Sequence, residues 1–300
     1  MKTFEIKMVE PQGYCGGVLK AISTAKKCRE NNPNEKITIL GNLVHNKYVR
    51  QALEYYKIDT IDNKNETRLE LLNHIQSGIV IFTAHGVSKS VYQKAIEKGL
   101  KIVDATCPFV AQTQKIVEEK CKEGYTVFYI GKNKHPEAES IYSSNQNVIL
   151  IENENIPDIS NKEIFVTNQT TMSIMDIQSI FKKIKEKYPN AQFHDEICNA
   201  TRVRQEAILN LKGQNYDILI VVGDPTSNNT QQLANIGQIA QIKKIIKAET
   251  VNDIDLDKIE DYAKIAITSG ASTPTYLTRQ IYEYLKEQDV KKEIRVENIL

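Results

Sequence analysis

The most restrictive feature of this 300-residue sequence is the spacing of three of its five cysteines. Cys15 and Cys107 lie 92 residues apart, and Cys107 and Cys198 lie 91 residues apart. A nearly constant period of this kind indicates a repeated structural unit, in which each copy supplies the same elements. We therefore compare the three segments that begin at these cysteines.

The three segments share one order of expected elements. An extended run ends at each cysteine, and amphipathic helices follow at 17–30, 108–121 and 201–213. Short apolar strands come next at 36–40, 125–130 and 216–222, and further strands open the stretches 78–88, 163–173 and 263–274. This alternation predicts an α/β fold of mainly parallel sheets with flanking helices. The predicted architecture is three pseudo-symmetric lobes around a central pocket, at about 14–106, 107–197, and 198–300 plus 1–13.

The other two cysteines are expected in the hydrophobic core. Cys28 and Cys121 lie 13 and 14 residues after their leading cysteines, on the apolar faces of the two expected helices. In the third segment the matching position is Leu211. Because a leucine there indicates apolar packing, we interpret both cysteines as small buried hydrophobic residues.

The turns that follow the strands carry polar residues at matching positions. One set of turns begins with a glycine and places a histidine or serine four residues later, at His45, His135 and Ser227. The other set contains His85, Thr170 and Ser272. Ligands of parallel sheets bind beyond the carboxyl ends of the strands, where all of these turns are expected. Neutral donors and backbone N–H groups at helix starts suit a phosphate or diphosphate.

Two residue patterns leave more than one interpretation open. Glu137, in "HPEAES", is either a first-turn acid favoured by the helix dipole or a proton donor in a shielded pocket. The three cysteines could provide a thiolate nucleophile, part of a Cys3His zinc site, or the ligands of an iron–sulfur cluster. A cluster held by three cysteines leaves one iron open to a substrate.

Composition and charge exclude several classes of protein. A net charge of +1 gives no support for binding nucleic acid or an anionic membrane. The first residues, "MKTFEIKMVEPQGY", lack the apolar stretch of a signal peptide, and no run approaches the ~18 apolar residues of a membrane helix. Five cysteines in such a chain predict reduced thiols and a cytoplasmic location.

From about residue 9 to residue 285 the chain resembles the LytB family of 4-hydroxy-3-methylbut-2-enyl diphosphate reductases. The resemblance rests on nine segments in the same order. They are "GYCGGV", "VHNKYV", "FTAHGVS", "DATCP", "HPEAE", "QTTMS", "ICNATRVRQEA", "TSNNTQQL" and "SGASTP".

The resemblance implies a trilobed α/β protein around one [4Fe–4S] cluster, held by Cys15, Cys107 and Cys198. The implied reaction is the last step of the non-mevalonate (MEP) pathway, a reductive dehydroxylation of 4-hydroxy-3-methylbut-2-enyl diphosphate to isopentenyl diphosphate and dimethylallyl diphosphate. The substrate's hydroxyl binds the open iron, and Glu137 delivers protons with Thr170 and His135. The implied substrate-binding residues are His45, His85, His135, Thr170, Ser227, Asn228, Asn229 and Ser272. An electron donor such as ferredoxin or flavodoxin is the implied protein partner, with no nucleic acid and no membrane.

The sequence departs from the family pattern at two positions. Gln12 stands where the family commonly has an arginine, which removes a positive charge near the first cysteine. Asn228 stands where a serine is usual, and its amide can still donate a hydrogen bond.

Two alternative functions stay open, a metal- or thiol-dependent phosphate-ester hydrolase and an iron–sulfur sensor. Glu137 argues against the sensor, because proton delivery matters only when a substrate is converted.

Overall fold

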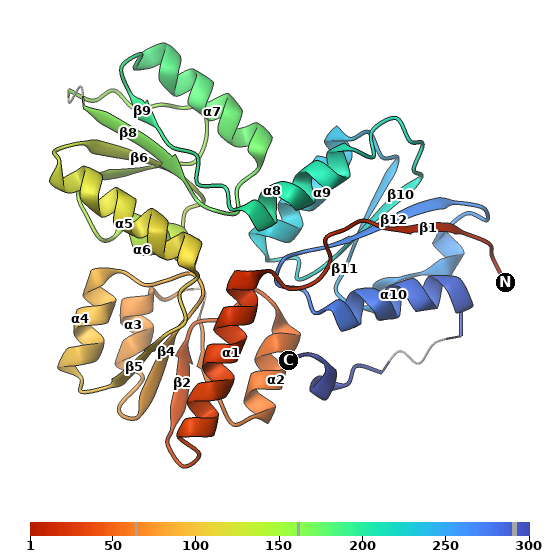
Figure 1. Ribbon diagram of the computed structural model, residues 1–300, viewed down its shortest axis with the longest axis horizontal. Helices are drawn as coiled ribbons and strands as arrows, with labels where there is room; N and C mark the ends of the chain where they lie inside the picture. The colour runs from red at the N-terminus through yellow and green to blue at the C-terminus, as the bar shows by residue number, and fades with distance from the viewer. Residues whose placement is uncertain (64, 161–162, 290–292) are drawn as a thin grey trace. The chain divides into compact units, whose positions relative to one another are not determined.

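The structure is a computed structural model that describes residues 1–63, 65–160, 163–289 and 293–300. These residues form three four-stranded sheets in which the paired strands are parallel, with helices in the connections (Figure 1). The predicted α/β class is therefore confirmed. None of the described helices is long and apolar enough to cross a membrane.

The first compact unit consists of Met1–Val18, His45–Ala52 and Asn199–Leu300. Its sheet has the order β1-β12-β10-β11, and β1 pairs with β12 so that Glu5 lies opposite Lys264. The strands are β1 (Glu5–Met8), β10 (Ile218–Val222), β11 (Lys244–Ala248) and β12 (Lys264–Ser269). The helices are α8 (Asn199–Leu209), α9 (Asn228–Ile239) and α10 (Thr275–Glu287), with 3-10 turns η1 (Val251–Asp253), η2 (Leu256–Lys258) and η3 (Val296–Asn298).

The second compact unit consists of Leu19–Val44 and Leu53–Cys198 and contains two sheets, ordered β3-β2-β4-β5 and β7-β6-β8-β9. The strands are β2 (Ile37–Leu40), β3 (Asp59–Ile61), β4 (Ile79–Phe82), β5 (Lys101–Asp104), β6 (Thr126–Ile130), β7 (Val148–Ile151), β8 (Ile164–Asn168) and β9 (Gln192–Phe193). The helices are α3 (Arg68–Asn73), α4 (Lys89–Glu97), α5 (Pro108–Lys122), α6 (Pro136–Tyr142) and α7 (Ile174–Lys187). Two more helices, α1 (Gly16–Asn31) and α2 (Lys47–Tyr55), contain residues of both units.

All three sheets repeat one topology. In each, the strand that precedes a cysteine lies at one edge, and the two most buried strands occupy the centre. The central strands β2, β4, β8 and β10 are buried along their whole length, as expected for strands covered by helices on both faces. The strands of each sheet come from one of the three predicted segments, and the exact bounds of the lobes stay a prediction.

The sequence analysis did not identify the strand at the other edge of each sheet. These strands are β3, β7 and β11. Two of them carry charged residues, Asp59 in β3 and the exposed Lys244 and Lys247 in β11. Edge strands need only one buried face, so their residues give a weaker apolar signal than those of central strands.

Burial confirms the predicted core positions of two cysteines and corrects one helix face. The apolar face expected for the helix at 201–213 includes Val203, Ala207 and Leu211. Cys28 and Cys121 are each 6% exposed. In α8, however, Val203 is only partly buried, whereas Arg204 and Gln205 are buried. The reason is that the Arg204 guanidinium donates to two backbone carbonyl groups, which compensates for the burial of its charge.

Candidate functional site

The three repeated cysteines are held by the same backbone hydrogen bond in all three sheets. In each case the cysteine N–H donates to the carbonyl oxygen two residues past the end of a central strand. The hydrogen bonds join Cys15 to Ala271, Cys107 to Ala84 and Cys198 to Thr170, each at 3.0 Å. These three cysteines are partly exposed, in contrast with the buried core cysteines. Partly exposed thiols at strand ends can act as thiolate ligands, which suit zinc or an iron–sulfur cluster.

The loop that carries Cys15 is fixed to β12 and α8. The Gln12 side-chain amide donates to the carbonyl oxygens of Val9 (2.7 Å) and Ile267 (2.9 Å). Arg204 donates to the carbonyl oxygen of Gly13 over 2.8 Å. Gln12 therefore has a structural role of its own in the segment that follows β1. Arg204 also supports this loop, although the sequence analysis gave it no role and only its place in "TRVRQEA" pointed to it.

Three predicted substrate-binding residues begin helix α9 in the first unit. The Ser227 hydroxyl caps the helix by accepting from the N–H of Thr230 over 3.4 Å. Asn228 and Asn229 follow in the first turn and are both buried. The Asn229 side chain is 5% exposed, and neither its Nδ2 nor its Oδ1 atom has a hydrogen-bond partner within the described residues. Burying an amide without a hydrogen-bond partner costs about 1–3 kcal/mol of folding free energy. Such an amide indicates a site for a polar ligand.

His45 and Ser272 are joined in the same unit. The Ser272 hydroxyl donates to the backbone carbonyl oxygen of His45 over 3.0 Å. Ser272 also directly follows Ala271, which accepts the Cys15 N–H. The predicted metal ligand and two predicted substrate-binding residues of this unit therefore share one hydrogen-bonded set of loops.

In the second unit, Glu137 is a carboxyl group almost without contact with water. It is 1% exposed, and burial raises its pKa from 4.5 to about 7. The Thr170 N–H and hydroxyl donate to its two oxygens over 2.7 and 2.9 Å, and the Tyr129 hydroxyl donates over 3.4 Å. These hydrogen bonds favour the charged form and moderate the effect of burial. The sequence analysis missed Tyr129, because in "YTVFYI" it reads as an apolar strand residue.

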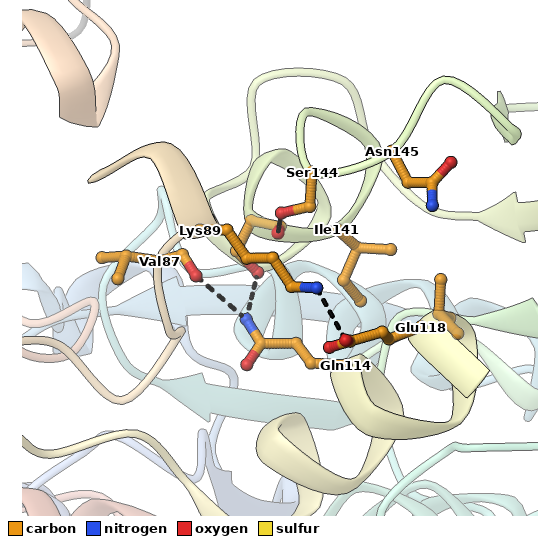
Figure 2. A pocket seen from close by; sticks show the side chains of 9 residues that line it. Val87, Lys89, Gln114, Glu118, Ile141, Ser144 and Asn145 are labelled. Carbon is orange, nitrogen blue, oxygen red and sulfur yellow. Dashed lines mark hydrogen bonds and ion pairs between the residues drawn. The ribbon is translucent and has the colours of Figure 1, made fainter. Parts of the chain in front are cut away.

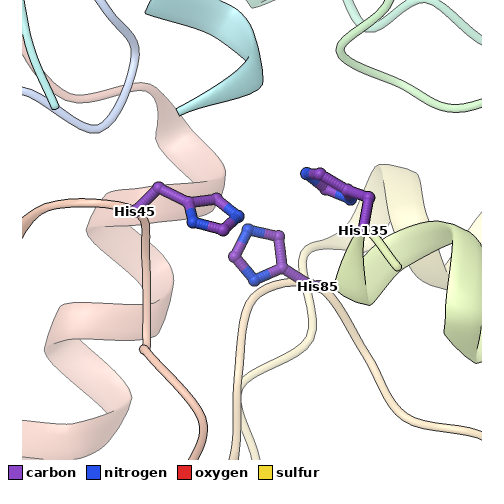
Figure 3. A group of neighbouring side chains, drawn as sticks. All are labelled: His45, His85 and His135. Carbon is purple, nitrogen blue, oxygen red and sulfur yellow. The ribbon is translucent and has the colours of Figure 1, made fainter. Parts of the chain in front are cut away.

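Two of the three predicted histidines lie side by side in this unit (Figure 3). His135 is the N-cap of α6, and its Nδ1 atom accepts the N–H of Glu137 over 3.2 Å. The neutral ring of His135 therefore carries its proton on Nε2. The ring of His85 meets that of His135 edge to face, with centroids 5.5 Å apart, and a nitrogen of each ring lies within 4.8 Å of the other. Cys198 connects to this group, because its N–H donates to Thr170.

The predicted site residues thus form two groups, one in each unit. The first unit contains Cys15, His45, Ser227, Asn228, Asn229 and Ser272. The second unit contains Cys107, Cys198, His85, His135, Glu137 and Thr170. Each group contains at least one cysteine, at least one histidine and a neutral hydrogen-bond donor.

Comparison with known proteins gives matches over most of the chain. The model of the family described as "LytB protein" matches residues 6–286. A 4-hydroxy-3-methylbut-2-enyl diphosphate reductase of Anoxybacillus flavithermus is 46% identical over 290 residues, which cover 95% of this chain and 91% of that protein. The enzyme of the same name from Listeria monocytogenes is 45% identical over 95% of this chain and 87% of its own length.

Two solved structures are also similar. The E-1-hydroxy-2-methyl-but-2-enyl-4-diphosphate reductase from Plasmodium falciparum has a TM-score of 0.84 at 31% identity, covering 95% of this chain and 88% of its own. A structure described as (E)-4-hydroxy-3-methyl-but-2-enyl diphosphate reductase, the terminal enzyme of the non-mevalonate pathway, has a TM-score of 0.66 at 25% identity. It covers 95% of this chain and 100% of its own.

Proposed function

Because the chain belongs to the LytB protein family, we propose that it reduces 4-hydroxy-3-methylbut-2-enyl diphosphate to isopentenyl diphosphate and dimethylallyl diphosphate. The reaction takes up two electrons and two protons and releases the substrate's hydroxyl group as water. It is the last step of the non-mevalonate pathway of isoprenoid synthesis.

The observation that carries the proposal is the recurrence of one backbone hydrogen bond at the three cysteines. A thiol nucleophile would account for one cysteine, whereas a [4Fe–4S] cluster accounts for Cys15, Cys107 and Cys198 together. The proposal therefore requires the thiolates of all three cysteines. When bound, such a cluster supplies electrons and an iron that is open to the substrate's hydroxyl oxygen.

Glu137 is the proposed proton donor. With a pKa of about 7, this carboxyl group is close to half protonated at neutral pH, so it can both hold and release a proton. Thr170 fixes both carboxyl oxygens, which orients the acid. Tyr129 adds a third donor on the side of β6.

The remaining residues are proposed to bind the diphosphate. Ser227, Asn228 and Asn229 offer side-chain donors at the start of α9, where the helix dipole favours an anion. The histidines can gain positive charge beside a bound anion. The proposed diphosphate ligands are His45, His85, His135, Thr170, Ser227, Asn228, Asn229 and Ser272. The unpartnered amide of Asn229 supports this assignment, because a bound phosphate oxygen satisfies its donor.

The proposal also includes an electron donor such as ferredoxin or flavodoxin and a cytoplasmic location. No disulfide joins any of the five cysteines in the described residues, which supports a reducing compartment.

Anaerobic purification followed by iron, sulfide and zinc analysis tests the cofactor. We expect a brown protein with iron and sulfide that consumes the substrate when dithionite and a viologen supply electrons. A colourless protein with one zinc per chain would refute the cluster. A brown protein that leaves the substrate unchanged would favour the sensor, and release of inorganic phosphate would favour the hydrolase.

A further inference from the structure

Gln114 lies outside the proposed site but touches two of the segments that carry it. It is on α5, seven residues or about two helical turns after Cys107, the N-cap of that helix. Its Nε2 atom donates to the Ser140 hydroxyl over 2.9 Å and approaches the carbonyl oxygen of Val87 at 3.4 Å (Figure 2). Val87 belongs to the loop of His85, and Ser140 belongs to the helix that His135 begins.

The loop of His85 is shaped to receive this amide. Gly86 has a φ of +71°, and a Cβ atom at this position would lie 2.6 Å from Nε2 of Gln114. Only a glycine therefore allows the Gln114 side chain to lie directly against the backbone between His85 and Val87. The contact fixes the residue that directly follows His85.

The other end of the contact reaches the backbone of Glu137. The Ser140 hydroxyl accepts from Gln114 and donates to the carbonyl oxygen of Glu137 over 2.7 Å. Three hydrogen bonds in series thus connect the carbonyl group of Val87 with that of Glu137. Through the Gly86 contact and this series, one side chain connects the backbone on both sides of the His85–His135 ring pair.

A cavity lies beside Gln114, between α5, α6 and the loop that leads into α4. The cavity has a volume of about 170 Å³, and Gln114 forms part of its wall together with Lys89 and Glu118, which pair over 2.7 Å (Figure 2). Because the space next to Gln114 is open, the loop and the helix can shift when the amide is removed.

We propose that Gln114 is a positioning residue, whose side-chain amide holds the loop of His85 at a fixed distance from the helix that begins at His135. This inference rests on the proposed function, in which both histidines bind the diphosphate of the substrate. Gln114 itself touches no reacting group. Its effect on binding is exerted through His85.

The test compares Gln114→Met with Gln112→Met in the iron-loaded protein. Gln112 is exposed on the same helix, so the matched control has the same substitution without the contact. Gln114→Met is expected to raise the dissociation constant of inorganic diphosphate, measured by calorimetry, and the KM of the substrate by about ten-fold. Gln112→Met is expected to leave both unchanged.

A double-mutant cycle shows whether Gln114 acts through His85. In a His85→Ala background, Gln114→Met is expected to change the diphosphate dissociation constant by less than about two-fold. Equal effects in the two backgrounds, or equal effects of the Gln114 and Gln112 substitutions, would overturn the proposal. If the Gln114→Met protein loses iron, Gln114→Glu is used in its place, because it keeps the shape of the side chain without its N–H donors. Loss of iron from both variants would mean that Gln114 is a purely structural residue.

The experiments distinguish a failure of the Gln114 inference from a failure of the proposed function. A wild-type protein that binds diphosphate but does not reduce the substrate refutes the reductase proposal, and the calorimetric series still decides the role of Gln114. A wild-type protein that does not bind diphosphate refutes both.

Discussion

Glu137 combines nearly complete burial with three hydrogen-bond donors, and this combination makes its protonation sensitive to pH near neutrality. Glu137→Gln keeps the shape of the side chain and removes its acid. We expect the variant to retain iron and to lose about 10²–10⁴-fold in turnover, the usual contribution of a general acid. In the wild type, kcat/KM is expected to fall as the pH rises above about 7, because the proton is then lost. Wild-type turnover in the variant would show that Glu137 is only a first-turn acid.

The same carboxyl group makes stability depend on pH. Its pKa is higher in the folded chain than the ordinary 4.5, so the folded state binds this proton more tightly than the unfolded state does. Stability is therefore lost as the pH rises from about 4.5 to about 7, by roughly 1.4 kcal/mol per unit of pKa shift and about 3 kcal/mol in total.

Glu137→Gln removes this titration. Thermal unfolding of both proteins between pH 5 and pH 8 is expected to show the variant gaining stability relative to the wild type as the pH rises. A constant difference over this range would mean that Glu137 keeps an ordinary pKa.

The five cysteines are expected to fall into two classes when each is changed to alanine. Cys28→Ala and Cys121→Ala should keep iron and cost about 1 kcal/mol of stability, because these thiols pack as small hydrophobic groups. Cys107→Ala should lose iron. Iron and sulfide analysis of the three variants makes the comparison, and loss of iron from either core variant would contradict the assignment.

At the scale of residues, the sequence predicted the roles of residues that have counterparts in the other segments. It missed the roles of residues that have no such counterpart. Cys28 could be predicted to be buried because Leu211 replaces it in the third segment. Tyr129, Gln114 and Arg204 have no such marker, since each acts by donating to a group that is distant in sequence. Contacts of this kind depend on packing between elements, which periodicity does not reveal.

Helix caps distinguish structural serines from those proposed to bind substrate. Ser227 caps α9 and Ser173 caps α7 through equivalent hydrogen bonds to the third helical N–H, of 3.4 and 3.3 Å. Ser227→Ala and Ser173→Ala should each cost about 1 kcal/mol in the free energy of unfolding. Only Ser227→Ala should also raise the dissociation constant for diphosphate. Equal effects of the two changes on diphosphate binding would contradict the assignment of Ser227.

At the scale of elements, central strands and long amphipathic helices were predictable and edge elements were not. The strand β10 is apolar and buried at all five positions, and α5 buries the apolar face expected from its sequence. The strand β3 has three residues and begins with Asp59. It is defined by pairing with β2, an interaction between segments that its own sequence does not encode.

For the whole molecule, the proposed cluster adds a covalent connection between residues far apart in the chain. Removal of iron by a chelator under air should therefore lower the unfolding temperature, because metal binding stabilises the folded state over the unfolded one. Calorimetry of the protein with and without iron measures this change, and identical traces would show that iron does not stabilise the folded state.

The overall architecture was more predictable than its details because it occurs three times. One α/β segment alone gives an ambiguous pattern, whereas three aligned segments average out differences such as the charged edge strands. The lobe bounds and the roles of the site residues stay predictions. The roles depend on the cofactor and substrate that these residues bind, which the sequence of one segment does not encode.

The pairing of β1 with β12 has a consequence for the synthesis of this protein. The ribosome adds Glu5 well before its partner Lys264, by roughly tens of seconds at common rates of translation. The residues of the second unit, 19–44 and 53–198, are all added between these two. The strand β1 is thus made before the second unit but can pair with β12 only after it, and the backbone partner of Cys15, Ala271, is also made later. Iron delivered before β12 is made would therefore meet Cys15 without the hydrogen bond that holds its loop.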